Sequence, residues 1–262
     1  QKAMKKIFTR MIFALLAWII ILTGCSPASD ETYNMKAENM RLEIAVTGGL
    51  EKAKERLNSA KGNMEDQILS TAESLSSMTL EEKVAQMFMV RCPSPDAAAV
   101  QEKYQFGGYI LFSADFRDNT PDQVREHIAS YQDAAKIPMF IGVDEEGGIV
   151  NRISLYPQFR AVPFHSPREL YDEGGWELIK SDTEEKCRLL GSLGINLNFA
   201  PVADVSADPS DYMYPRAFGG SPQDTAQYVR TVVDVMEQNG IGSVLKHFPG
   251  YGSNVDTHTG IA

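Results

Sequence analysis

The sequence predicts an α/β protein of the (β/α)8 TIM-barrel type, in which helices surround a sheet of parallel strands. Three observations support this fold class. Short, nearly continuous apolar runs alternate with amphipathic stretches, polar residues cluster directly after the apolar runs, and paired glycines stand at the same places. Parallel strands that are buried on both faces produce such runs. In a barrel, the loops that follow the strands build the active site.

The barrel region is predicted to begin at residue 77 with a helix start, because Glu82 follows Thr79 at the spacing of a capping box. We expect strands at 87–90, 107–112, 138–143, 195–199 and 241–246, and helices at 121–135, 184–193 and 224–239. A closed barrel needs eight strands and typically about 250 residues. We therefore expect the domain over 77–262 to be incomplete, with its C-terminal strands missing from this chain.

Residues 1–24 have the pattern of an export signal. Lys5, Lys6 and Arg10 precede the apolar run 11–22, which is short for a membrane of ~30 Å hydrocarbon thickness and typical of a signal peptide. The Leu-Thr-Gly-Cys that ends at Cys25 resembles a bacterial lipobox, which implies that Cys25 is lipidated and becomes the mature N-terminus. An uncleaved anchor helix is the alternative. The lipobox predicts an extracytoplasmic protein, lipid-anchored to the bacterial cell membrane.

Residues 25–76 are polar, and Leu, Ile and Ala recur at helical spacing among charges over 50–75. This region is expected to be a polar, helical tether between the lipid anchor and the barrel region. Binding of a partner helix is the alternative.

The charge balance excludes two classes of partner. Removal of residues 1–24 lowers the count of basic residues from 25 to 21 against 35 acidic ones, so the net charge changes from −10 to −14. An acidic protein does not fit nucleic-acid binding, nor electrostatic docking to anionic lipid, which leaves the acyl chains at Cys25 as the membrane anchor. Cys92 and Cys187 can pair, but their distance cannot be read from sequence. We expect no cofactor, no metal and a monomer.

The segment 246–258 is the most informative part of the chain. Lys246 and His247 follow the apolar run 241–245, where a buried strand is expected to end. Asp256 and His258 are two residues apart, a spacing that lets a carboxylate orient an imidazole and raise its pKa. A solvated turn is the alternative reading of this pair.

This segment resembles the signature of family 3 glycoside hydrolases, in the bacterial β-N-acetylhexosaminidase branch. That signature is Lys-His-Phe-Pro-Gly-x-Gly followed by Asp-Ser/Thr-His. The chain differs at Tyr251, where many members have His, at Ser253, where Asp is common, and in a spacer that is one residue shorter. We interpret these differences as loop variation, because Asp256 and His258 keep their spacing.

Two further segments resemble the same family. Residues 142–152 are similar to Val-Asp-Gln-Glu-Gly-Gly-Arg-Val-x-Arg, which implies that Asp144 and Arg152 contact the non-reducing sugar. Residues 214–219 match Arg-Ser/Ala-Phe-Gly, which implies a sugar contact for Arg216. An acidic surface turn and a surface arginine are the alternatives. Asp204 is expected to hydrogen-bond loop backbone, and the two remaining histidines, His127 and His165, are expected to be surface or packing residues.

The resemblance implies a retaining exo-β-N-acetylhexosaminidase that removes terminal β-linked N-acetylglucosamine from oligosaccharides or muropeptides. His258 with Asp256 would be the acid/base dyad, and Lys246 and His247 would bind sugar hydroxyls. The nucleophilic aspartate is expected beyond the end of this chain, so the chain alone is expected to be inactive.

Three alternatives remain open at this stage. A β-N-acetylglucosaminide phosphorylase can use the same dyad, because inorganic phosphate approaches an imidazole without like-charge repulsion. His247, Asp256 and His258 have the chemistry of zinc ligands. A non-catalytic, glycan-binding surface lipoprotein is the third.

Overall fold

The structure, a computed structural model, describes residues 75–257. The chain divides into two compact units, Gln1–Ser76 and Ser77–Ala262, and almost all described residues belong to the second. The predictions for the signal peptide at 1–24, for Cys25 and for nearly all of the tether lie outside the described residues, as does His258. No helix within the described part of the chain is both long and apolar enough to cross a membrane.

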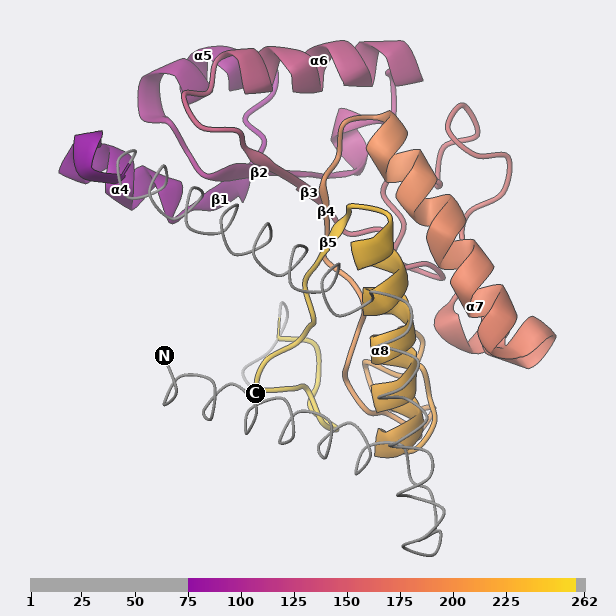
Figure 1. Ribbon diagram of the computed structural model, residues 1–262. Helices are drawn as coiled ribbons and strands as arrows, with labels where there is room; N and C mark the ends of the chain where they lie inside the picture. Colours follow the sequence, from indigo (N-terminus) through magenta and orange to yellow (C-terminus); the bar gives the residue numbers. More distant parts are fainter. Residues whose placement is uncertain (1–74, 258–262) are drawn as a thin grey trace, which may run out of the picture. The chain divides into compact units, whose positions relative to one another are not determined.

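The second unit is built on a five-stranded parallel sheet in the order β1-β2-β3-β4-β5 (Figure 1). Neighbouring strands in the sequence are therefore also neighbours in space, as in a β/α barrel. The strands are β1 (Met89–Arg91), β2 (Gly108–Leu111), β3 (Phe140–Val143), β4 (Leu197–Asn198) and β5 (Gly242–Ser243). Each lies in or overlaps one of the five predicted runs, which confirms the predicted α/β class with a parallel sheet.

Helices connect the strands, with α5 packed against α6 and α7 against α8 (Figure 1). They are α4 (Leu80–Gln86), α5 (Ala97–Tyr104), α6 (Pro121–Asp133), α7 (Pro167–Ser192) and α8 (Pro222–Gln238), with a 3-10 turn, η1 (Ser113–Asp115). A capping box fixes the first residue of α4, α6, α7 and α8, with caps at Thr79, Thr120, Ser166 and Ser221. Three of these four helices also begin with proline, whose missing N–H costs nothing there.

The prediction for α7 was wrong at its start. The helix begins at Pro167 and not near 184, because Ser166 and Glu169 form a capping box. Gly175, with φ of 62°, interrupts the helix and breaks its apolar periodicity. Helix α5 was not predicted at all.

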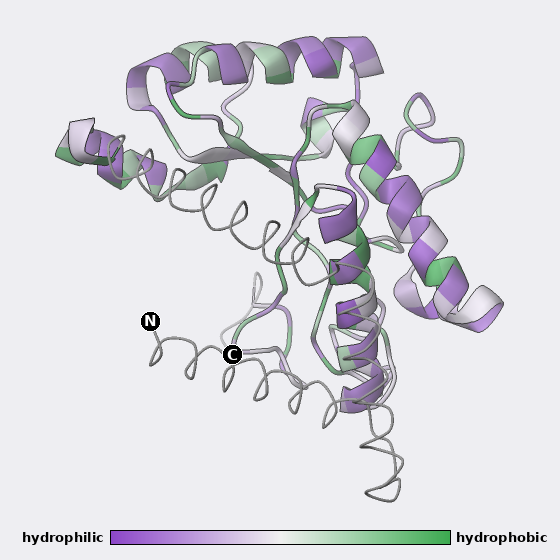
Figure 2. Cartoon of the chain, in the orientation of Figure 1, coloured by the Kyte–Doolittle hydropathy of each residue, from purple (hydrophilic) through white to green (hydrophobic). Residues whose placement is uncertain are grey.

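The core lies between the strands and these helices. Tyr109, Ile141 and Val143 on the strands are fully buried, and α6 contributes Val124 and Ile128. Figure 2 shows the strands as largely hydrophobic, whereas much of the helix surface is hydrophilic. Cys92 and Cys187 are buried free thiols, so they form no disulfide with each other, and burial raises the pKa of both.

Candidate active site

The carboxyl ends of β3 and β5 bring two predicted site residues into contact. Lys246, just beyond β5, donates a hydrogen bond from Nζ to Oδ1 of Asp144, just beyond β3, at 2.6 Å. These residues are 102 positions apart in the sequence. Parallel strands end at the same edge of a sheet, so the fold itself creates this pair.

Glu146 joins the same group and was not among the predicted site residues. Its carboxylate forms an ion pair with Lys246 and accepts two parallel hydrogen bonds from Arg216, at 3.0 Å from Nε and 2.7 Å from Nη2. Burial alone would lower the pKa of Arg216, but the hydrogen bonds and the charge of Glu146 outweigh it and raise that pKa. We call Asp144, Glu146, Arg216 and Lys246 the charged cluster.

His247 lies beside this cluster in a defined tautomer. Its Nε2 is 3.3 Å from Nη2 of Arg216, and its Nδ1 is 2.7 Å from Oδ2 of Asp204. A guanidinium only donates hydrogen bonds, so Nε2 accepts and the proton stands on Nδ1, which donates to Asp204. The nitrogen of His247 that faces the cluster therefore serves as an acceptor in this arrangement.

Asp204 has the role that the sequence suggested. It is buried, and it accepts backbone N–H groups from His247 at 3.0 Å and from Tyr251 at 2.8 Å. It therefore joins the segment after β4 to the segment after β5.

Arg152 stands apart from the charged cluster. Its guanidinium carbon lies 5.9 Å from the centre of the Phe112 ring, and Arg91 lies 5.2 Å from the same ring. Within the described residues, no hydrogen bond or ion pair joins Arg152 to Asp144 or Lys246. The structure thus gathers Asp144, Arg216, Lys246 and His247, whereas Arg152, in the same loop after β3, lies near Phe112 at the end of β2.

Glu145 holds the loop that carries Arg152. Its fully buried carboxylate accepts backbone N–H groups from Arg152 at 2.7 Å, Ile153 at 2.8 Å and Ser154 at 3.0 Å, and the Ser154 hydroxyl at 2.5 Å. Asn198, at the end of β4, exchanges two 3.0 Å hydrogen bonds with the Glu145 backbone. The loop is thereby fixed to the sheet.

The paired glycines serve packing in this structure. Paired glycines such as Gly147 and Gly148 can let the backbone approach a ligand closely. A Cβ on Gly147 would instead meet the His165 carbonyl at 2.2 Å, and one on Gly148 would meet the Ser166 side chain at 2.8 Å. Both positions also have positive φ, so glycine is required there for close contact between two chain segments.

Asp256 lies at the end of a loop over 250–257, which we call the motif loop. Burial raises the pKa of Tyr212, and the nearby charge of Asp256 raises it further. The hydroxyl of Tyr251 is 2.7 Å from that of Thr257. His258 follows directly but lies outside the described residues, so its pairing with Asp256 stays a prediction.

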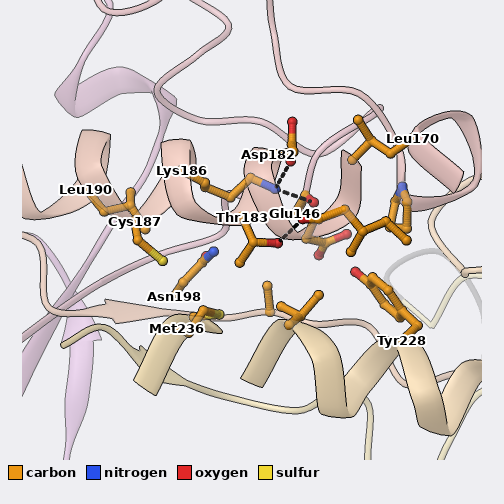
Figure 3. A pocket seen from close by; sticks show the side chains of 14 residues that line it. Glu146, Leu170, Asp182, Thr183, Lys186, Cys187, Leu190, Asn198, Tyr228 and Met236 are labelled. Atoms are coloured by element: carbon orange, nitrogen blue, oxygen red, sulfur yellow. Dashed lines mark hydrogen bonds and ion pairs between the residues drawn. The ribbon is translucent and has the colours of Figure 1, made fainter. Parts of the chain in front are cut away.

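A small cavity lies behind Glu146, between α7 and α8 (Figure 3). Lys186 points into it, pairs with Asp182 at 3.4 Å and donates to the Glu146 carbonyl at 3.2 Å. The volume is about 20 Å³, which suits one water molecule and not a sugar. The cavity therefore belongs to the support of Glu146. Among residues 75–257, no group of three or more His, Cys, Asp or Glu side chains can hold a metal ion.

The chain is similar in sequence to several known proteins. Residues 79–262 match the glycosyl hydrolase family 3 N terminal domain. The chain is 32% identical to beta-hexosaminidase A of Pseudoalteromonas piscicida over 173 residues, covering 64% of this chain and 29% of that protein. It is 31% identical to beta-hexosaminidase LpqI of Mycobacterium tuberculosis over 182 residues, covering 68% and 45%.

Two solved structures have a similar fold. M. tuberculosis LpqI superposes with a TM-score of 0.61 at 29% identity, covering 69% of this chain and 52% of that one. A family 3 beta-N-acetylglucosaminidase from Paenibacillus sp. FPU-7 gives 0.61 at 29% identity, covering 70% and 35%. The chain spans less than half the length of the two curated relatives above.

Proposed function

The chain belongs to glycosyl hydrolase family 3, and from this premise we propose that it forms the sugar-binding and acid/base part of a retaining exo-β-N-acetylhexosaminidase. The proposed substrates carry terminal β-linked N-acetylglucosamine on an oligosaccharide or muropeptide. Several relatives are named beta-hexosaminidase or beta-N-acetylglucosaminidase, which supports the activity. The observation that carries the proposal is the charged cluster at the carboxyl ends of the strands.

The cluster offers the chemistry that a pyranose ring needs. A carboxylate such as Asp144 can accept hydrogen bonds from two neighbouring hydroxyls, while Lys246 and Arg216 donate to sugar oxygens. The ion pairs hold these groups in place before the sugar arrives, so little ordering remains to be done on binding. Arg152, whose loop is held by Glu145, would donate a hydrogen bond to the sugar from its position near Phe112.

Glycoside hydrolysis with retention needs an acid/base and a nucleophilic carboxylate. We assign the acid/base role to His258, with Asp256 holding its tautomer and stabilising the imidazolium. His258 would protonate the departing oxygen and then take a proton from the water that releases the sugar. His247 does not suit this role, because its Nε2 accepts from Arg216 and its proton is directed at Asp204.

The nucleophile is proposed to lie beyond residue 262. The carboxylates of Glu146 and Asp204 are buried and engaged by cations or backbone N–H groups, and Asp144 pairs with Lys246. An engaged carboxylate of this kind is a poor nucleophile. The aspartate that traps the sugar would therefore come from another strand of the barrel.

The test is turnover of a nitrophenyl N-acetyl-β-glucosaminide by the protein at its natural length. His258→Ala should lower kcat about 10²–10⁴-fold, the usual contribution of general acid–base catalysis, whereas His127→Ala on the exposed face of α6 should not. The 1–262 chain alone should show no turnover. Full activity of His258→Ala would refute the proposal, and phosphate-dependent release of sugar 1-phosphate would favour the phosphorylase.

We also propose that the protein is anchored outside the cytoplasm through lipid on Cys25. The pattern over 1–25 supports this proposal. Cys25→Ala should move the protein from the membrane to the soluble extracytoplasmic fraction. Incorporation of labelled palmitate into that variant would contradict the assignment.

A further inference from the structure

Two tyrosines from different loops meet beside the charged cluster. Tyr212 follows β4 and Tyr251 follows β5, yet their ring centres are 5.5 Å apart. The Tyr251 ring also meets the His247 imidazole edge-on at 5.1 Å. The pair therefore connects the sugar-binding side of the site to the motif loop.

Their hydroxyls reach two consecutive residues of the motif loop. Tyr251 shares a 2.7 Å hydrogen bond with Thr257, and the Asp256 carboxylate lies near enough to Tyr212 to raise the pKa of that tyrosine. Both contacts come immediately before residue 258. A shift of the backbone at 256–257 would move the next side chain by a comparable amount.

The middle of the motif loop is exposed to solvent. The residues at 252–255 are exposed, and the loop's own backbone hydrogen bond, among the described residues, runs from Asn254 N to Tyr251 O at 3.1 Å. Tyr251 is by contrast anchored, since its N–H donates to the buried Asp204. The backbone of Tyr251 is thus held in place by Asp204, and its hydroxyl connects it to Thr257 at the far end of the loop.

We propose that Tyr251 and Tyr212 are positioning residues, which hold Thr257 and Asp256 so that the following histidine faces the bound sugar. This inference rests on the proposed function, in which residue 258 is the acid/base. The relevant group on both side chains is the phenolic hydroxyl, because an aromatic ring without it cannot donate a hydrogen bond to another hydroxyl or to a carboxylate.

The first measurement follows the loop itself, by NMR relaxation of the Thr257 methyl group in the 1–262 chain. Tyr251→Phe keeps the ring contacts and removes only the hydroxyl, so the methyl group should become more mobile. The double variant Tyr251→Phe/Thr257→Val should free the loop no more than Tyr251→Phe does, as judged by the neighbouring Val255 methyls. Tyr104→Phe, on the exposed end of α5, is the matched control and should change nothing.

The second measurement is turnover by the natural-length protein. Tyr251→Phe, Tyr212→Phe and Thr257→Val should each lower kcat about three- to tenfold, the worth of one ordinary hydrogen bond, with KM within twofold. Thr257→Ser, which keeps the hydroxyl, should retain kcat. A role in overall folding would not produce this split between kcat and KM or this rescue.

The two measurements separate the two ideas. Unchanged Thr257 mobility and unchanged kcat in Tyr251→Phe would overturn the positioning role. If the wild-type protein shows no turnover, the proposed function fails, and the methyl measurement alone still decides whether the hydroxyls hold the loop.

Discussion

The two parts of the candidate site are held in opposite ways. In the charged cluster, the side chain of Glu146 is 3% exposed, that of Arg216 10% and that of Lys246 13%, and charged partners surround each of them. The motif loop is largely exposed, and a single pair of hydroxyls, those of Tyr251 and Thr257, joins its two ends.

This difference follows from the cost of burying charge. Removing an ion from water costs several kcal/mol, which only well-placed partners offset. The cluster must therefore be fully formed or not formed, which makes it a rigid recognition site. The motif loop has no such constraint and lies at the low-stability end of the structure. Under the proposed function, sugar recognition would be fixed by the fold, whereas proton transfer would depend on the more exposed motif loop.

The largest effect should come from breaking the cluster. Glu146→Gln removes the anion between two buried cations and leaves Arg216 without its carboxylate partner. Loss of one member of a buried pair typically costs about 3–5 kcal/mol. Urea unfolding should show this loss, together with weaker sugar binding.

The matched control is Glu177→Gln. Glu177 pairs with Lys180 on the surface of α7, where its side chain is 85% exposed, and exposed pairs contribute about 0–1 kcal/mol. Equal unfolding midpoints for the two variants would show that burial does not distinguish the cluster from a surface pair.

A smaller effect should come from Glu145→Gln. Each carboxylate oxygen of Glu145 accepts two hydrogen bonds. In the glutamine variant, the amide nitrogen would replace one of these oxygens, and the two donors bonded to that oxygen would lose their acceptor. A buried donor left without a partner costs roughly 1–3 kcal/mol. The sugar affinity should fall as well, because Arg152 loses its support. If Glu145→Gln is destabilised but binds the sugar with wild-type affinity, Arg152 does not take part in sugar recognition.

The smallest loss of stability should come from changing Glu185, which belongs to neither the charged cluster nor the motif loop. Hydrogen bonds from Arg160 at 2.9 and 3.1 Å lower the pKa of Glu185 from its ordinary value of 4.5. A carboxyl group whose pKa is lower in the folded state than in the unfolded state stabilises the fold at pH values above its unfolded-state pKa. That stabilisation is lost as the pH falls through the folded-state pKa. Since the side chain is 46% exposed, Glu185→Gln should cost less than about 1 kcal/mol at pH 7. The difference should shrink below pH 4.5, and a cost that persists at pH 2 would show that packing, not charge, is responsible.

Much of the fold was readable from the sequence, because buried parallel strands leave apolar runs. Helix α6 was predicted from residue 121, where Thr120, Pro121 and Gln123 form a strong start signal in the structure. The start of α7 was missed although Ser166, Pro167 and Glu169 form the same signal. The glycines at 174–175 concealed the periodicity that should have drawn attention to it.

The site was readable only in part, for a physical reason. Asp144 and Arg216 were found through the resemblance to family 3 glycoside hydrolases, and Lys246 also because it directly follows an apolar run. Glu146 was missed, although two cations in a buried site require an anion and the sequence offers one two residues after Asp144. Its pairing with Arg216 spans 70 residues of sequence, and local sequence patterns cannot predict contacts between residues so far apart in the chain. The tyrosine contacts are likewise visible only in space.

The central claim is that recognition and proton transfer reside in separate parts of one site. The most direct test measures both N-acetylglucosamine affinity and turnover in the natural-length protein carrying Asp256→Ala and His258→Ala, beside Lys246→Met. The account predicts that the double variant loses at least about 100-fold in kcat while binding the sugar within threefold of wild type, and that Lys246→Met loses sugar affinity. Retention of full turnover by the double variant, or an equal loss of affinity in both proteins, would contradict it.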